Sequence, residues 1–147
     1  MNSKYEINTK ENREFLKASC EDLLNFGHRF PSPNGGSYYL GDDGTPWKDR
    51  NRETWITCRM AHVYSLGLML GHEGSGELVD AALKGLRGEL HDEKNGGWYA
   101  GLTADGNILP NKQCYAHAFV ILAASSGVLA DVPGAKELLD DALALYD

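Results

Sequence analysis

The stretch GGSYY at residues 35–39 returns as GGWY at residues 96–99, about 60 residues further along the chain. Each copy runs through an Asp-Gly turn and then into an apolar stretch that opens with an aromatic residue. The residues around each turn alternate as in a short hairpin, and the apolar stretches have the period of helices. The sequence therefore predicts a unit of hairpin, inner helix and outer helix that occurs twice, at about 35–90 and 96–147.

The helices follow from the spacing of apolar residues. Inner helices are expected at about 52–71 and 113–126, and an outer-type helix at about 11–30. A stripe at 79–90 marks the outer helix of the first unit, and Pro133 opens that of the second. Such units cannot bury their apolar faces alone, so they stack or close into a ring. We predict an all-α fold of antiparallel helix pairs with short β-hairpins at one end, and a core of Ile56, Met60, Val63, Leu83, Leu86, Phe119, Leu122, Leu138 and Leu139.

The first and last helices carry apolar stripes of their own. The 11–30 helix has its stripe at Leu16, Leu23 and Phe26. The last helix reaches Asp147 without the Gly, Asn or basic last turn that commonly ends a helix. We interpret residues 1–147 as the first portion of a longer helical-repeat domain, the alternative being a small helical domain with a ragged end. The last stripe would then form an apolar flank prone to self-association, made of Leu138, Leu139, Ala142, Leu143 and Tyr146.

Composition and charge exclude several classes of partner. The 147 residues are 42% hydrophobic and 24% charged, which is ordinary for a globular domain. A net charge of -7 without clustered Lys and Arg argues against nucleic acid and anionic membranes as partners. No apolar stretch approaches the roughly 18 residues of a membrane span, and the start has no apolar leader. A cytoplasmic location is therefore expected.

The cysteines do not have the pattern of a disulfide framework or a metal site. Cys20, Cys58 and Cys114 are odd in number and lie in apolar helical contexts, which predicts reduced, buried thiols. Cys58, His62 and Cys114 lack a fourth ligand and the C-x-x-C spacing of a zinc site. We expect no metal and no cofactor, because the glycine motifs that bind nucleotides are also absent from the sequence.

Three residues on the first inner helix can carry chemistry. Trp55, Arg59 and His62 share one stripe beside the apolar side of the predicted helix. A tryptophan supplies a flat apolar platform for a sugar ring, and an arginine supplies a fixed fork of donors for hydroxyl or anionic oxygens. The residues alone leave two interpretations of Arg59 open, a donor in an active site and a member of a structural ion pair.

Three motifs in this order resemble the N-acylglucosamine 2-epimerase superfamily: WITCRMAHVYS at residues 55–65, GGWYA at 96–100 and KQCYAHAF at 112–119. Within the superfamily, they are most similar to the bacterial aldose-ketose isomerases that act on mannose or sulfoquinovose. The resemblance extends over nearly the whole chain. It implies an (α/α)6 barrel, which is six helix pairs in a ring around a central sugar site, and residues 1–147 would be its N-terminal portion.

The resemblance also implies which residues bind substrate. Arg59, the arginine of the W-x-x-x-R-M motif, is expected to line the sugar site and contact substrate oxygens. Tyr115, the tyrosine of the K-Q-x-Y-x-H motif, is expected to face the same pocket, and Trp55 to form one of its walls.

Three further residues are expected near this site without touching substrate. An ideal helix places His117 about 160° from Tyr115, which favours a structural role for this histidine. His62 remains open between packing and support of the site. Tyr99 is expected to support the hairpin at the mouth of the barrel, with stacking on substrate as the alternative.

The activity implied by the resemblance is that of a metal-free sugar isomerase or 2-epimerase with a monosaccharide as its partner. Converting an aldose to a 2-ketose requires a base that removes a proton next to a carbonyl, through an enediol. Family members take histidines from later inner helices for this step, so we expect the catalytic histidines outside residues 1–147 and no activity from the chain alone.

Two other functional classes remain open at this point. One is a non-catalytic carbohydrate-binding or helical-repeat interaction module. The other is a different carbohydrate-active enzyme on the same barrel, such as a glycoside hydrolase, which needs paired carboxylates. Trp55 and Tyr115 stand at the helix starts where those carboxylates would be expected, which counts against the hydrolase.

Overall fold

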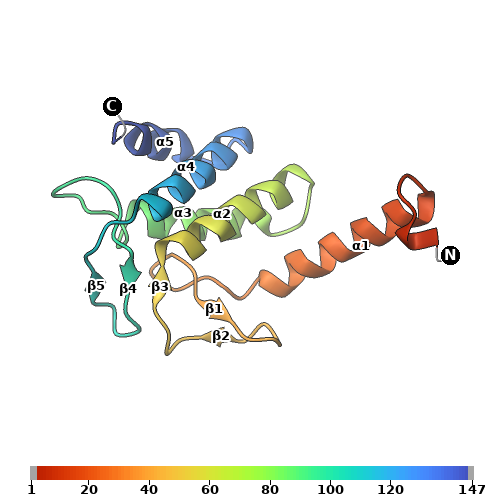
Figure 1. The fold of residues 1–147 in the computed structure, drawn as a ribbon, viewed down its shortest axis with the longest axis horizontal. Coiled ribbons are helices and arrows are strands. Elements are labelled where there is room, and N and C mark those ends of the chain that lie inside the picture. The colour runs from red at the N-terminus through yellow and green to blue at the C-terminus, as the bar shows by residue number, and fades with distance from the viewer. Residues whose placement is uncertain (1–2, 146–147) are drawn as a thin grey trace.

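The computed structural model describes residues 3–145 and shows one long helix followed by two helix pairs (Figure 1). A short 3-10 turn at Ser3–Tyr5 precedes the first helix. The helices are α1 (Lys10–Gly27), α2 (Thr54–Met69), α3 (Ser75–Arg87), α4 (Cys114–Leu129) and α5 (Ala135–Leu143). The strands are β1 (Tyr39–Leu40), β2 (Pro46–Trp47), β3 (Arg52–Glu53), β4 (Gly101–Leu102) and β5 (Ile108–Leu109).

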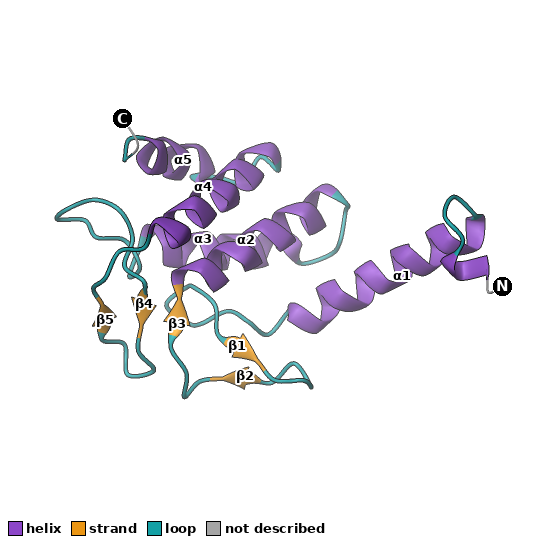
Figure 2. Ribbon diagram, in the orientation of Figure 1, coloured by secondary structure: helices purple, strands orange, loops and turns teal. Residues whose placement is uncertain are grey.

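The two units repeat closely. Helices α2 and α4 have 16 residues each and begin 60 positions apart, at Thr54 and Cys114. Each leads into a tight turn ending on a glycine with positive φ, Gly74 or Gly134, before α3 or α5 begins. Helix α2 packs against α3 and α4, α4 packs against α5, and the short strands gather near the first turns of α2 and α4 (Figure 2). The predicted fold class, helix pairs with hairpins at one end, is confirmed.

A glycine allows the inner and outer helices of each unit to approach closely. A Cβ atom on Gly67 of α2 would lie 2.5 Å from the Ser75 hydroxyl oxygen of α3. A Cβ on Gly127 of α4 would lie 2.8 Å from Cβ of Ala135 on α5. Both distances are shorter than van der Waals contact, so these helix crossings require glycine.

Each hairpin is fastened to the inner helix of its own unit through a backbone N–H. In the first unit, the N–H of Ser37 donates to Oγ1 of Thr57 at 3.0 Å. In the second unit, the N–H of Trp98 donates to Nε2 of His117 at 3.1 Å. Because the donors directly follow the two Gly-Gly pairs, the sequence repeat is also a repeat of this contact.

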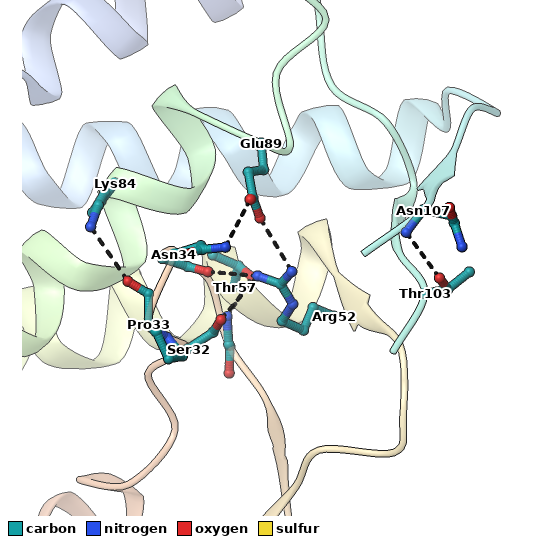
Figure 3. Close-up of polar contacts among 11 residues, drawn as sticks. Ser32, Pro33, Asn34, Arg52, Thr57, Lys84, Glu89, Thr103 and Asn107 are labelled. Carbon is teal, nitrogen blue, oxygen red and sulfur yellow. Dashed lines mark hydrogen bonds and ion pairs between the residues drawn. The ribbon is translucent and has the colours of Figure 1, made fainter. Parts of the chain in front are cut away.

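A basic residue ahead of each inner helix adds a second fastening, and Figure 3 shows that of the first unit, Arg52. The Arg52 guanidinium donates to the Ser32 hydroxyl at 3.0 Å and to the Gly35 carbonyl at 3.1 Å, and it pairs with Glu89 at 3.2 Å. In the second unit, the Lys112 ammonium pairs with Asp92 at 2.7 Å and donates to the Gly96 carbonyl. The two ends of the Gly-Gly loop are thereby tied to the start of the following helix.

The third strand was not expected from the sequence. Residues 52–53 were assigned to the first turn of a helix, but they form β3, and the helix begins at Thr54. Arg52 pairs with Leu102 and Glu53 pairs with Gly101, so β3 extends the second hairpin into a three-stranded antiparallel sheet. The prediction was wrong because this partner strand lies about 50 residues away, where the local periodicity carries no information about it.

The predicted core is correct for the outer helices and wrong at two inner-helix positions. Leu83, Leu86 and Leu138 are buried, and Phe119 and Leu139 are partly buried against the core. Val63 and Leu122 are each 40% exposed. They lie on the face of α2 and α4 that turns away from α3 and α5, and no described element covers this face. Ile56 and Met60 are half-buried.

The stripe predicted on the first helix is not buried by the described residues. Helix α1 extends away from the helix pairs (Figure 1), and it meets them chiefly near its C-terminal end, where Leu24 and Gly27 are buried. Leu16, Leu23 and Phe26 are exposed. Helix α1 has the predicted apolar stripe, but none of the described residues packs against these three side chains closely enough to bury them.

Two further expectations about burial were wrong. Cys58 is buried, but Cys20 and Cys114 are exposed, because one lies on the uncovered α1 and the other at the open start of α4. On α5, Leu138 and Ala142 are buried and Leu139 is half-buried, whereas Leu143 is 45% exposed, so only part of the predicted apolar flank is exposed. Tyr146 of that stripe lies outside the described residues. None of the helices in residues 3–145 is long and apolar enough to cross a membrane.

Candidate functional site

The first turns of the two inner helices bring two aromatic side chains together. Trp55 on α2 and Tyr115 on α4 lie edge to face with ring centroids 6.1 Å apart. Tyr115 also contacts Phe119, one turn along α4, at 4.9 Å. Edge-to-face pairs at these distances are favourable, and they fix the orientation of the rings. Tyr115 remains 54% exposed, so this aromatic surface is open to solvent.

Arg59 lies over this aromatic surface. Its guanidinium carbon is 4.7 Å from the centre of the Trp55 ring and 5.2 Å from the centre of the Phe119 ring. Each contact of this type contributes on the order of 0.5–1 kcal/mol at an exposed site. Within residues 3–145, Arg59 forms neither an ion pair nor a hydrogen bond through its side chain. The aromatic rings therefore hold the guanidinium while its N–H groups remain available to a ligand.

A carboxylate that sequence reasoning missed lies beside this group. Oε2 of Glu53 accepts a hydrogen bond from the Trp55 indole N–H at 3.1 Å and another from the Tyr39 hydroxyl. Burial, and next the hydrogen bond to Glu53, raise the pKa of Tyr39 to about 12, so its hydroxyl stays protonated and donates. Tyr39 and Glu53, with Arg50 and Asn51, line an open hollow of about 460 Å³.

Glu53 was missed because residues 52–53 were assigned to the first turn of a helix. The available signal was its place directly before the first apolar turn, where a carboxylate ordinarily caps the helix. Its side chain makes no such cap hydrogen bond. It turns instead towards Tyr39 and Trp55.

The two histidines of the motifs have other partners. Nδ1 of His62 lies 2.7 Å from the hydroxyl of Ser126, and this hydroxyl also lies 2.9 Å from the Leu122 carbonyl oxygen, so His62 links α2 to α4. Nδ1 of His117 donates to the Gln113 carbonyl at 2.9 Å, while its Nε2 accepts from Trp98. Both ring nitrogens of His117 are therefore engaged, and one of them holds the hairpin.

Tyr99 belongs to the second hairpin. Its pKa is raised by partial burial and by a hydrogen bond with Asp92. The pKa of Asp92 is lowered, first by the hydrogen bond from Lys112 and next by that from Asn95. Tyr99 therefore takes part in the fastening of the Gly-Gly loop, and the structure does not bring it together with Arg59.

The site thus consists of an aromatic platform, one guanidinium and one carboxylate. Such a group can stack against a sugar ring and donate several hydrogen bonds to its oxygens. The group includes neither motif histidine, because His62 contacts Ser126 and His117 contacts the hairpin. Across residues 3–145, no three His, Cys, Asp or Glu side chains converge so as to hold a metal ion.

Sequence comparison extends these observations to known proteins. The chain is 38% identical over 136 residues to the D-mannose isomerase of Thermobifida fusca, and 34% identical over 137 residues to that of Pseudomonas cannabina pv. alisalensis. These matches cover 92% and 93% of this chain but 33% of each relative. The chain therefore spans about a third of the length of the curated relatives it matches.

Solved structures share the arrangement of helices. The cellobiose 2-epimerase of Bacillus thermoamylovorans B4167 superposes with a TM-score of 0.73 at 28% identity, over 92% of this chain and 36% of that protein. A crystal structure of a D-mannose isomerase gives a TM-score of 0.78 at 22% identity, over 95% of this chain and 35% of that protein, and it shows likeness of fold alone. The helix pairs of this chain therefore correspond to part of the α/α barrel of these proteins.

The match to a protein family covers both units. Residues 35–147 match the sequence model of N-acylglucosamine 2-epimerase (GlcNAc 2-epimerase). The matched part of the chain begins at the first Gly-Gly pair. The chain belongs to the N-acylglucosamine 2-epimerase family.

Proposed function

We propose that this chain forms one wall of the sugar-binding site of an aldose-ketose isomerase or 2-epimerase of the mannose-fructose type. The observation that carries the proposal is the Arg59 guanidinium, which two aromatic rings hold and no described carboxylate neutralises. Arg59 is exposed, so the N–H groups of its guanidinium can be reached by a ligand. The names of the two D-mannose isomerases support mannose as the substrate.

Each residue has a distinct role in this proposal. Trp55 and Tyr115 form the platform along which the sugar lies, and the Tyr115 hydroxyl exchanges a hydrogen bond with it. Arg59 donates to an oxygen at the reacting end of the open-chain sugar. Negative charge develops on such an oxygen as the enediol forms, so a fixed cation there stabilises the transition state more than the ground state. The proton itself is moved by histidines that lie outside residues 1–147.

A chimera tests this proposal. Residues 35–147 would replace the matching segment of the Thermobifida fusca D-mannose isomerase, and conversion of D-mannose to D-fructose would be measured. We expect activity from the chimera, and we expect Arg59→Ala to lower kcat/KM on the order of 10²-fold, since removing a charged donor costs a few kcal/mol.

The matched control for the chimera is Arg87→Ala, which removes an arginine that pairs with Asp80 on the outer helix α3. This variant should retain kcat/KM within about twofold, because a surface ion pair contributes little. An active chimera whose kcat/KM is unaffected by Arg59→Ala would remove Arg59 from the site and contradict the proposal.

The two alternative functions gain less support. A glycoside hydrolase needs two carboxyl groups about 5–9.5 Å apart, whereas the lining of the hollow beside Trp55 contains one carboxylate, Glu53. A non-catalytic sugar-binding module would use the same platform. An inactive chimera that still binds D-mannose would favour that module. A cytoplasmic location remains a prediction from composition.

A further inference from the structure

We propose that Glu53 is a positioning residue, whose carboxylate holds the Trp55 indole in the plane on which the Arg59 guanidinium stacks. The consequence for sugar binding rests on the function proposed above. The effect on Trp55 itself does not, so the two can be tested separately.

The geometry concentrates two donors on one oxygen atom. Oε2 of Glu53 receives the indole N–H of Trp55 at 3.1 Å from α2 and the Tyr39 hydroxyl from β1. Hydrogen bonds to an ionised acceptor are roughly twice as strong as neutral ones. A tryptophan with its N–H bound in this way cannot rotate freely about its χ angles. The face that it presents to Arg59 is therefore constant.

The backbone of Glu53 is itself held firmly. It pairs with Gly101 of β4, and a Cβ atom on Gly101 would lie 3.0 Å from Cα of Glu53 and 2.5 Å from the carbonyl oxygen of Arg52. Strands β3 and β4 are therefore in close contact at this point, and this contact fixes the backbone position from which the Glu53 side chain extends. Arg52 is anchored in turn to Ser32 and Gly35.

The other roles open to a glutamate at this position are not used. Glu53 is the N-cap residue of α2, yet its carboxylate accepts no hydrogen bond from the first turn. It also forms no ion pair with Arg50 or Arg59, although both lie close enough to influence Tyr39 electrostatically. The first turn of α2 therefore lacks the stabilisation that an N-cap side chain ordinarily provides. The Glu53 carboxylate instead orients the side chains of Tyr39 and Trp55.

The experiment follows the Trp55 indole by NMR in the 147-residue chain labelled with ¹⁵N. The Trp55 resonance is assigned by its loss in Trp55→Phe. In Glu53→Ala we expect this resonance to shift and its N–H to exchange with solvent at least tenfold faster. Glu53→Gln, which keeps an oxygen acceptor, should stay within about threefold of the unmodified chain in exchange rate. Glu73→Ala, in the turn between α2 and α3, is the control and should change nothing.

D-mannose is the probe for the functional consequence. Its dissociation constant, measured from the same spectra, should rise at least fivefold in Glu53→Ala and less than twofold in Glu53→Gln. If Glu53 acts through the indole, Glu53→Ala should have no further effect on this constant in a Trp55→Phe background. Should Glu53→Ala unfold the chain, the comparison of Glu53→Gln with Tyr39→Phe replaces it, because each leaves the indole an acceptor and should preserve its resonance.

Several results would overturn the proposal. An unchanged Trp55 resonance in a folded Glu53→Ala chain would show that the carboxylate does not hold the indole. Equal damage from Glu53→Gln and Glu53→Ala would show that the charge acts on the sugar directly. If D-mannose binds to none of the chains while the resonance behaves as expected, the consequence for sugar binding fails and the positioning of Trp55 stands.

Discussion

Thr57 and His117 occupy equivalent places on α2 and α4, and each accepts a backbone N–H from the hairpin of its own unit. A hydroxyl and an imidazole thus perform the same task. The sequence shows a histidine inside a motif, which suggests chemistry, but only the partner 19 residues away shows that its Nε2 is occupied. Helix period places Trp55 and Arg59 on one stripe, and the resemblance of the K-Q-x-Y-x-H motif adds Tyr115, so this cluster could be predicted. Glu53 and Tyr39 could not, because their contact depends on where a hairpin folds back.

Asp92 gives a prediction about pH at this scale. Its hydrogen bonds from Lys112 and Asn95 hold the pKa of the carboxyl below its usual range, so the folded state binds its proton less readily than the unfolded state. The stability that Asp92 contributes is therefore present above its unfolded pKa of about 4 and is lost as pH falls through the lower folded pKa.

We expect Asp92→Asn to lower the melting temperature at pH 7, and we expect the difference from the unmodified chain to narrow as pH falls below about 4. Thermal unfolding followed by circular dichroism at several pH values measures this difference. Asp105→Asn, at the exposed turn between β4 and β5, is the control and should show almost none. A difference that stays constant from pH 7 to acid would mean that Asp92 does not act through its charge.

At the scale of elements, the helix pairs could be predicted and the close helix crossings could not. Apolar period and turn residues define α2 and α4 to within about three residues of their observed bounds, and α3 and α5 to within about four. A glycine inside an apolar helix, however, looks like a weak point in the sequence. Its purpose appears only when the second helix is in place, as at Gly67 and Gly127.

Gly127→Ala should therefore destabilise the chain, although alanine is the better helix former. The added methyl group would lie 2.8 Å from Cβ of Ala135, and overpacking of this kind costs about 1–3 kcal/mol. Gly76→Ala is the matched control, since its Cβ would meet only Leu68 at 3.8 Å; it should be neutral or stabilising by roughly 0.5–1 kcal/mol. Urea unfolding of the two variants measures both values. Equal free energies of unfolding would show that α4 and α5 are not in close contact.

At the scale of the whole molecule, most of the exposed apolar surface lies on other helices than the sequence predicts. The stripe on α5 is largely covered by α4, whereas the uncovered residues lie on α1 and on one face of the inner helices. The most exposed leucines of this surface are Leu16, Leu23, Leu70 and Leu129. An apolar surface of this extent is unusual on an isolated soluble domain. Helical period identifies an apolar face, but it does not identify what covers that face.

We predict that the 147-residue chain self-associates through this surface. Its sedimentation coefficient should rise with protein concentration, and it should bind a hydrophobic dye. Leu23→Ser together with Leu129→Ser should weaken the concentration dependence, whereas Ile7→Ser, outside the helices, should not. A chain that sediments as a monomer at every concentration and binds no dye would contradict this prediction.

The fastening of each Gly-Gly loop to its own inner helix has a consequence for the order of folding during synthesis. The contacts within the first unit join residues of the single segment 35–90, so this unit can close as soon as α3 has left the ribosome. Contacts between near neighbours in sequence form quickly, since little loop entropy is lost. The pairing of β3 with β4 must wait until the second hairpin has been made. Because β3 ends on Glu53, the nascent chain completes the support beneath Trp55 only after the second unit has begun to fold.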